Sequence, residues 1–329
     1  MLDMSRTPRG LLRDIANVVG AALDAAEGLG PDRVMVVGAW CRDILHSTLG
    51  HTFPTTATRD LDLALALSSW DAYRALAASF SQAGNTGIRF CIAGTDVDLL
   101  PFGSVEDPDG VVKPPSRGEE LSVWAFEEIF ASSLPLIITD TLSIRIPTVD
   151  GYAAAKLGAW LDRSKWHEAK DAADLALILY WYAESTLVHD TLYDTPAGNE
   201  ILAAEGADLP LAAAHLLGTD VIATIGTHRR KELLARWPGN ADLLTRVIGL
   251  RLRLGRGHGR PAGVVVGPGC PGGECADRGV RGGGDLVAHV GAAQGEGPAQ
   301  PVGSHLGGER AAVAQVEAAQ GEGGPAPGG

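Results

Sequence analysis

Two carboxylates two residues apart are the side chains of this chain best suited to metal chemistry. Asp60 and Asp62 open the segment Asp60-Leu-Asp-Leu-Ala-Leu-Ala-Leu67, which alternates polar and apolar residues at its start. Because side chains two residues apart in a strand point to the same face, we expect both carboxylates on one side of a sheet. Two like charges at that distance repel each other unless a cation lies between them. Hard oxygen ligands suit Mg²⁺, which is usually shared with substrate phosphates, so the pair predicts a magnesium site.

A third carboxylate is available on a second predicted strand. Asp98 lies in Val97-Asp98-Leu99, between two apolar residues, and Asp96 precedes it by two residues. Both would point to the same face, so either could join Asp60 and Asp62. The apolar neighbours favour Asp98, and Asp96 stays open as the alternative.

A glycine junction precedes these acids in the chain. Gly38 ends the run Arg33-Val-Met-Val-Val-Gly38 and is followed by a helix-like segment, residues 39–49. Backbone N–H groups at such a junction, together with the positive end of a helix, form a site for an anion such as phosphate. A metal, a helix start and an aligned hydroxyl together describe phosphoryl or nucleotidyl transfer.

The elements that must position these residues alternate between helices and strands. Their order predicts an α/β (α+β) sheet domain with its strand ends gathered on one side, followed by a helical bundle. We place the sheet domain at residues 1–147, the helical domain at residues 148–254 and a low-complexity tail at residues 255–329. The expected helices span residues 11–29, 39–49, 68–83, 119–131, 148–162 and 168–185, with shorter ones to 254, and the expected strands span residues 33–38, 60–67, 87–93, 96–102 and 136–146.

The order of these motifs resembles the signature of the DNA polymerase beta nucleotidyltransferase superfamily, which is a Gly-Gly or Gly-Ser turn, an Asp-x-Asp strand and a third acidic strand residue. The resemblance implies that Gly38 and Ala39 bind the nucleotide phosphates. It also implies that Asp60, Asp62 and Asp98 bind metal. Ala39 departs from the family pattern, because it lacks the hydroxyl group of serine.

An arginine after the glycine junction is a further candidate. Arg42-Asp43 is similar to the Arg-Asp pair of CCA-adding enzymes in the same superfamily, which implies that Arg42 contacts nucleotide. The alternative is an exposed pair on a helix. The further basic motifs of CCA-adding enzymes are not found after the acidic strand.

A segment further along the chain narrows the resemblance. Residues 146–163, which contain Lys156, and Lys170-Asp171-Ala-Ala-Asp174-Leu175 resemble the AbiEii-type toxins of type IV toxin–antitoxin systems. The resemblance implies that Lys156 neutralises the triphosphate as a point charge, and that Asp171 orients this lysine or accepts a proton from the attacking hydroxyl. A lysine that extends from an Ala-rich helix surface is the alternative for Lys156. Arg163 is interpreted as a solvated charge.

These resemblances predict a Mg²⁺-dependent nucleotidyltransferase that moves a nucleoside monophosphate from an NTP to tRNA or protein, as a toxin with a cognate antitoxin. Gly38-Ala39-Trp40 with Asp-x-Asp also resembles the aminoglycoside adenylyltransferases, so a small antibiotic is the alternative acceptor. A degenerate protein that binds nucleotide or a partner without turnover is the third alternative.

Composition limits both the partners and the folded length. The 329 residues carry a net charge of −13, which disfavours broad, charge-driven binding of nucleic acid. The four cysteines show no metal-binding pattern, and without an apolar run of membrane length we expect a cytoplasmic protein. Residues 255–329 hold 23 of the 43 glycines and no Phe, Trp, Tyr or Ile, so we predict a disordered tail. The basic residues within 228–253 predict a solvated helix surface or a contact for RNA phosphates.

Overall fold

The computed structural model describes residues 4–163 and 170–237 of the chain. The expected tail, residues 255–329, and the helices expected between residues 238 and 254 lie outside the described residues.

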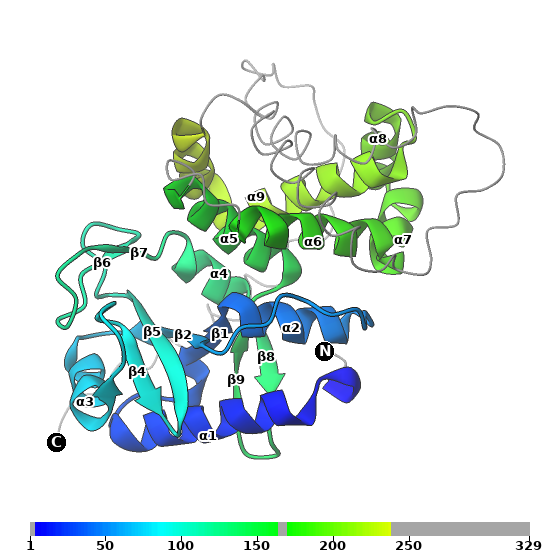
Figure 1. Cartoon of the computed structure of the whole chain (residues 1–329). Coiled ribbons are helices and arrows are strands. Elements are labelled where there is room, and N and C mark those ends of the chain that lie inside the picture. Colours follow the sequence, from blue (N-terminus) through cyan, green and yellow to red (C-terminus); the bar gives the residue numbers. More distant parts are fainter. Residues whose placement is uncertain (1–3, 164–169, 238–329) are drawn as a thin grey trace, which may run out of the picture. The chain divides into compact units, whose positions relative to one another are not determined.

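A mixed seven-stranded sheet carries the residues predicted to bind metal. Its strand order is β3-β4-β5-β2-β1-β9-β8 (Figure 1). Strand β2 runs antiparallel to β1 and parallel to β5, and the register sets Asp62 of β2 opposite Val37 of β1 and opposite Asp98 of β5. The start of β2 therefore lies between the end of β1 and the Asp98 region of β5. The strands are β1 (Val34–Val37), β2 (Leu61–Leu67), β3 (Ser81–Gln82), β4 (Arg89–Ile92), β5 (Thr95–Gly103), β8 (Leu134–Ile137) and β9 (Ser143–Ile146), with β6 (Val111–Val112) and β7 (Leu121–Ser122) paired in a second small sheet.

Helices precede, interrupt and follow the sheet strands. The first of them, α1, buries Ile15, Val18, Val19 and Ala22, which are apolar residues at helical spacing. The change from strands to helices comes between β9 and α5, and residues of both the strands and the later helices share one hydrophobic core. The fold is therefore α/β, as predicted. The nine α-helices of the described residues are α1 (Arg9–Ala25), α2 (Gly38–Thr48), α3 (Asp71–Ser79), α4 (Phe126–Ser132), α5 (Val149–Arg163), α6 (Lys170–Glu184), α7 (Thr186–Asp194), α8 (Pro196–Ala204) and α9 (Leu209–Arg236).

The segment expected as a helix over residues 119–131 is helical only at its end. Leu121 and Ser122 form β7 and pair with β6, and Ala125 adopts a left-handed conformation with φ of 64°. Helix α4 therefore begins at Phe126. Pairing with β6, the two-residue strand just before it in the chain, decides this segment, and local helix periodicity does not reveal that pairing.

The segment expected as one strand over residues 136–146 is a hairpin. Strands β8 and β9 pair antiparallel, and the Thr139 hydroxyl accepts hydrogen bonds from the N–H groups of Thr141 and Leu142 at the turn. A threonine side chain supplies the turn here, whereas the sequence prediction relied on glycine and proline as turn markers.

Helix α9 is long and apolar, although the sequence analysis expected no apolar run of membrane length. By length and composition alone it could cross a membrane, and it is the one such helix within residues 4–163 and 170–237. It packs against α5 and α6, buries Leu217, Val221 and Ile225, and is interrupted by non-helical backbone at Gly226. We therefore interpret α9 as a core helix of the helical layer.

A close approach between α5 and Trp124 predicts opposite outcomes for two helical glycines. A Cβ added at Gly158 would lie 2.6 Å from Cε3 of Trp124, whereas a Cβ at Gly20 of α1 would have no atom within 4 Å. We expect Gly158→Ala to lower the free energy of unfolding by about 1–3 kcal/mol through overpacking. Gly20→Ala should raise it by up to about 1 kcal/mol through helix propensity. Chemical denaturation of both variants checks the two signs, and a stabilised Gly158→Ala variant would contradict the close contact.

Candidate functional site

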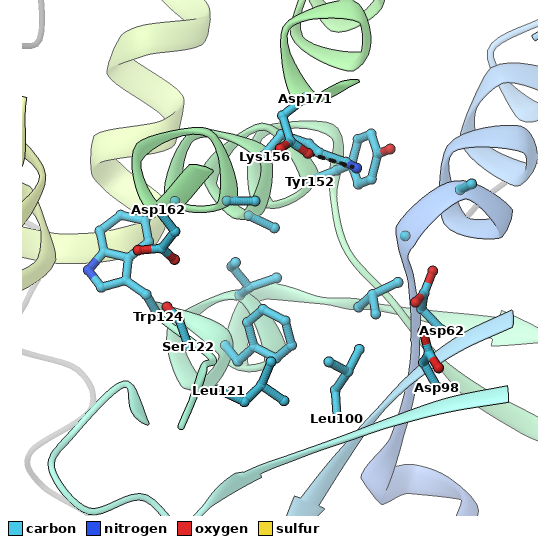
Figure 2. Close-up of a pocket in the computed structure, with 18 of the residues that line it drawn as sticks. Asp62, Asp98, Leu100, Leu121, Ser122, Trp124, Tyr152, Lys156, Asp162 and Asp171 are labelled. Atoms are coloured by element: carbon cyan, nitrogen blue, oxygen red, sulfur yellow. Dashed lines mark ion pairs between the residues drawn. The ribbon is translucent and has the colours of Figure 1, made fainter. Parts of the chain in front are cut away.

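A cavity of about 750 Å³ gathers most of the predicted site residues. It opens where β1 ends and β2 begins, and α5 forms part of its wall. Figure 2 shows Asp62 and Asp98 side by side on one wall, Lys156 and Asp171 on another, and Leu100 and Leu121 across the cavity from Lys156. A volume of this size suits a small-molecule ligand. Of the eight predicted site residues, the cavity is lined by Gly38, Ala39, Asp60, Asp62, Asp98, Lys156 and Asp171.

Gly38 and Asp62 are in contact at the junction of β1 and α2. Gly38 has φ of 64°, which turns the chain from the strand directly into the helix. A Cβ at this position would lie 1.9 Å from Oδ2 of Asp62, so only glycine leaves room for that carboxylate. The Asp62 carboxylate therefore lies at the start of a helix, beside the backbone that was predicted to bind phosphate.

Asp98, not Asp96, lines the cavity. Asp96 is exposed and pairs across the sheet with Cys91, which is also exposed. Asp98 is part-buried and faces Asp62 through the parallel register of β2 and β5. The apolar neighbours of Asp98 therefore indicate the inner of the two positions.

An arginine that the sequence analysis overlooked bridges two of the carboxylates. Nε of Arg89 donates to Oδ1 of Asp98 at 2.8 Å, and its Nη2 donates to Oδ2 of Asp98 at 2.7 Å and to Oδ2 of Asp60 at 2.6 Å. Thr58 donates a further hydrogen bond to Asp60. The hydrogen bond to Asp98 is the chief cause of a raised pKa at Arg89, so the guanidinium stays charged.

The turn after β4 is a sequence signal for the position of Arg89. Ala93 and Gly94 both have positive φ, of 49° and 81°, and form the two-residue turn between β4 and β5. Turns of this kind fix the hairpin register. Counting back from the turn sets Arg89 directly opposite Asp98.

The carboxylates fit a divalent cation by chemistry but not in their present arrangement. In the described part of the chain, no group of three His, Cys, Asp or Glu side chains is drawn together closely enough to hold a metal ion. Asp60, Asp62 and Asp98 nevertheless line one cavity, and two of them already bind a cation, the guanidinium of Arg89. Carboxylate oxygens of this kind are the donors that Mg²⁺ prefers.

Lys156 lies in a buried network of alternating charges on another wall. Its Nζ is 2.7 Å from Oδ2 of Asp174 and 3.6 Å from Oδ1 of Asp171. Asp171 also pairs with Nε of Arg163 at 3.0 Å; the Arg163 side chain is 41% exposed, so the charge that was expected to be solvated is partly solvated and also paired. Burial, and then the charge of Asp174, raises the pKa of Tyr152 well above its ordinary value, so its hydroxyl stays protonated and donates to Asp174. These contacts fix the lysine in place.

Arg42 lies outside the cavity lining and is not the exposed residue considered as the alternative. Only 4% of Arg42 is accessible to solvent. Its guanidinium donates to Asp43 at 2.9 Å, to the backbone oxygen of Thr56 at 2.6 Å and to Asp174 at 3.3 Å. In this structure Arg42 therefore connects α2 to the segment before Asp60 and to α6, and its predicted contact with nucleotide would require these bonds to break.

The basic residues of α9 are partly buried rather than forming a uniformly solvated surface. Arg229 is 2% exposed and forms ion pairs with Asp109, Glu128 and Glu232. Arg236 pairs with Asp162, which lines the cavity. Arg229 thus links α9 to α4 and to the segment before it, and Arg236 links α9 to α5, which leaves less positive charge for RNA.

Comparison with protein-family models, with curated proteins and with solved structures finds no match to this chain. What the chain can do chemically is therefore inferred from the cavity. The cavity combines carboxylates, a helix start, a lysine held at a fixed place and several apolar side chains. Such a combination suits a ligand that has both phosphate groups and an apolar ring.

Proposed function

We propose that the chain is a Mg²⁺-dependent nucleotidyltransferase with the fold of the DNA polymerase beta superfamily, which moves a nucleoside monophosphate from an NTP to an acceptor. The observation that carries the proposal is the contact between Gly38 and Asp62. The missing side chain at the helix start leaves space for a carboxylate, and the strand register sets Asp98 next to it. A catalytic metal would thus be held beside a phosphate-binding backbone.

Each group of cavity residues would have its own role. Asp60, Asp62 and Asp98 would hold Mg²⁺, which neutralises the triphosphate when bound. Gly38 and Ala39 would let the phosphates approach the start of α2. Lys156 would supply a fixed positive charge on another wall of the cavity.

Asp171 has two roles open to it, and its contacts favour one. It forms ion pairs with both Lys156 and Arg163. The amine of Lys156 and the guanidinium of Arg163 engage both of its oxygens, and the residue is buried, so neither oxygen is left for an attacking hydroxyl. We therefore assign Asp171 to the orientation of Lys156 rather than to proton transfer.

The acceptor is proposed to be tRNA or protein, with a toxin role, a cognate antitoxin and a cytoplasmic location. The cavity also supports the second candidate, an aminoglycoside acceptor. Glu120 lines it apart from the carboxylates proposed to bind metal, and such an acid would attract a cationic antibiotic; Asp162 also lines it but is paired with Arg236.

Transfer of label from each of the four NTPs tests the activity. The protein is incubated with Mg²⁺ and with total tRNA, cell protein or aminoglycosides in turn. Asp62→Asn should lower the transfer rate by at least about 100-fold, since it removes a metal-binding charge without changing the size of the side chain. Asp190→Asn, on the exposed surface of α7, should leave the rate unchanged. Equal rates for Asp62→Asn and wild type, or no transfer to any acceptor, would refute the proposal.

A further inference from the structure

The guanidinium of Arg89 occupies the space between two of the three carboxylates assigned to metal. Arg89 is the cross-strand partner of Asp98, and its fork binds both oxygens of that carboxylate, at 2.8 and 2.7 Å. The same Nη2 reaches Asp60 at 2.6 Å. A single cationic group thus neutralises part of the negative charge that Asp60, Asp62 and Asp98 bring into one cavity.

This contact competes with metal binding. Paired hydrogen bonds between a guanidinium and a carboxylate are among the stronger polar contacts in proteins. A divalent cation that bound both Asp60 and Asp98 would use the same oxygens and would be repelled by the guanidinium. Metal and Arg89 cannot therefore both hold these two carboxylates in the present geometry.

The surroundings of Arg89 allow it to move. Its side chain is 29% exposed and lines the cavity itself. The guanidinium can therefore leave the two carboxylates by rotation of its own side chain, without separation of β4 from β5. A triphosphate in the cavity would offer the fork an equivalent partner, because phosphate oxygens accept paired hydrogen bonds in the same way.

We propose that Arg89 is a displaceable counter-ion: it holds Asp60 and Asp98 in the absence of nucleotide, and it moves to the phosphates of the NTP when a divalent cation takes its place. The inference rests on the proposed function. It implies that metal and NTP bind cooperatively, since the nucleotide stabilises the position of Arg89 that frees the carboxylates.

Direct measurement of Mn²⁺ binding tests this without relying on turnover. Free and bound Mn²⁺ are distinguished by electron paramagnetic resonance, with and without non-hydrolysable NTP analogues. In wild type, the analogue should tighten Mn²⁺ binding by about 10-fold or more. Arg89→Gln should bind Mn²⁺ about 10- to 100-fold more tightly than wild type without nucleotide, and the analogue should add little.

Arg117→Gln is the matched control for the loss of one positive charge. Arg117 lines the same cavity, but its guanidinium donates to the backbone oxygen of Thr86 and pairs with Glu119. It should change Mn²⁺ affinity by no more than about 3-fold, since it leaves the carboxylates as they are. Arg89→Lys keeps the charge but loses the fork, so its affinity should fall between those of wild type and Arg89→Gln.

The outcomes separate this inference from the proposed function. If Arg89→Gln and Arg89→Lys bind Mn²⁺ no more tightly than wild type and Arg117→Gln, Arg89 is not a counter-ion that metal must displace, although the enzyme can still be a nucleotidyltransferase. If no variant binds Mn²⁺ with or without nucleotide, the metal site and the proposed function both fail. Thermal unfolding of each variant shows that the binding data come from folded protein.

Discussion

Gly38→Ala is expected to lower the free energy of unfolding by about 3 kcal/mol and to reduce nucleotidyl transfer by at least about 100-fold. The left-handed backbone at this position costs about 1–2 kcal/mol for a residue with a Cβ. The Cβ would also lie 1.9 Å from Oδ2 and 2.7 Å from Cγ of Asp62. Asp62 cannot simply retreat, because its backbone is fixed opposite Val37 and Asp98 in the sheet. Overpacking of this kind costs a further amount of about 1–3 kcal/mol. It also displaces Asp62, a proposed metal ligand.

Gly84→Ala separates the two contributions. Gly84 has φ of 66°, close to the 64° of Gly38, but a Cβ there would meet no atom within 4 Å. This control should therefore show only the conformational cost, about 1–2 kcal/mol, with transfer unchanged. Adding Asp62→Ala to Gly38→Ala should restore part of the stability, without the activity, because the clashing carboxylate is gone. Urea denaturation that gives equal losses for Gly38→Ala and Gly84→Ala would show that the contact with Asp62 is unimportant.

The sequence predicted the parts of the site that depend on neighbours along the chain. Asp60 and Asp62 fall at the start of a strand, and Gly38 at a strand-to-helix junction, because alternation and glycine are local signals. The preference for Asp98 over Asp96 followed from the apolar neighbours of Asp98 and agrees with the cavity lining.

Contacts between distant segments were beyond such signals. Arg42 and Asp174 are separated by 132 positions in the chain, and only the packing of α2 against α6 brings them together. The strands β6 and β7 were hidden for another reason: two residues are too few to show alternation, and their pairing shortened the helix expected before Ser132. Arg89 is an intermediate case, because its partner is set by the hairpin turn.

Lys156→Met is expected to lower the free energy of unfolding by about 3–5 kcal/mol, because it leaves two buried carboxylates without their shared cation. Asp171 and Asp174 are 0% and 5% exposed, and Nζ of Lys156 lies 3.6 Å and 2.7 Å from them. Methionine has a similar length and no charge, so packing is largely kept. The Michaelis constant for NTP should rise in the fraction that stays folded, because a positive charge near the phosphates is lost.

Two further variants show whether charge is the cause. Lys113→Met removes an exposed lysine and should change stability by no more than about 0.5 kcal/mol. Lys156→Met combined with Asp174→Asn removes one positive and one negative charge, and it should recover about half of the loss, since Arg163 still pairs with Asp171. Guanidinium denaturation measures all three. If Lys156→Met is as stable as Lys113→Met, the lysine is not the counter-charge of these carboxylates, and its buried position would have to be explained by packing along its aliphatic chain alone.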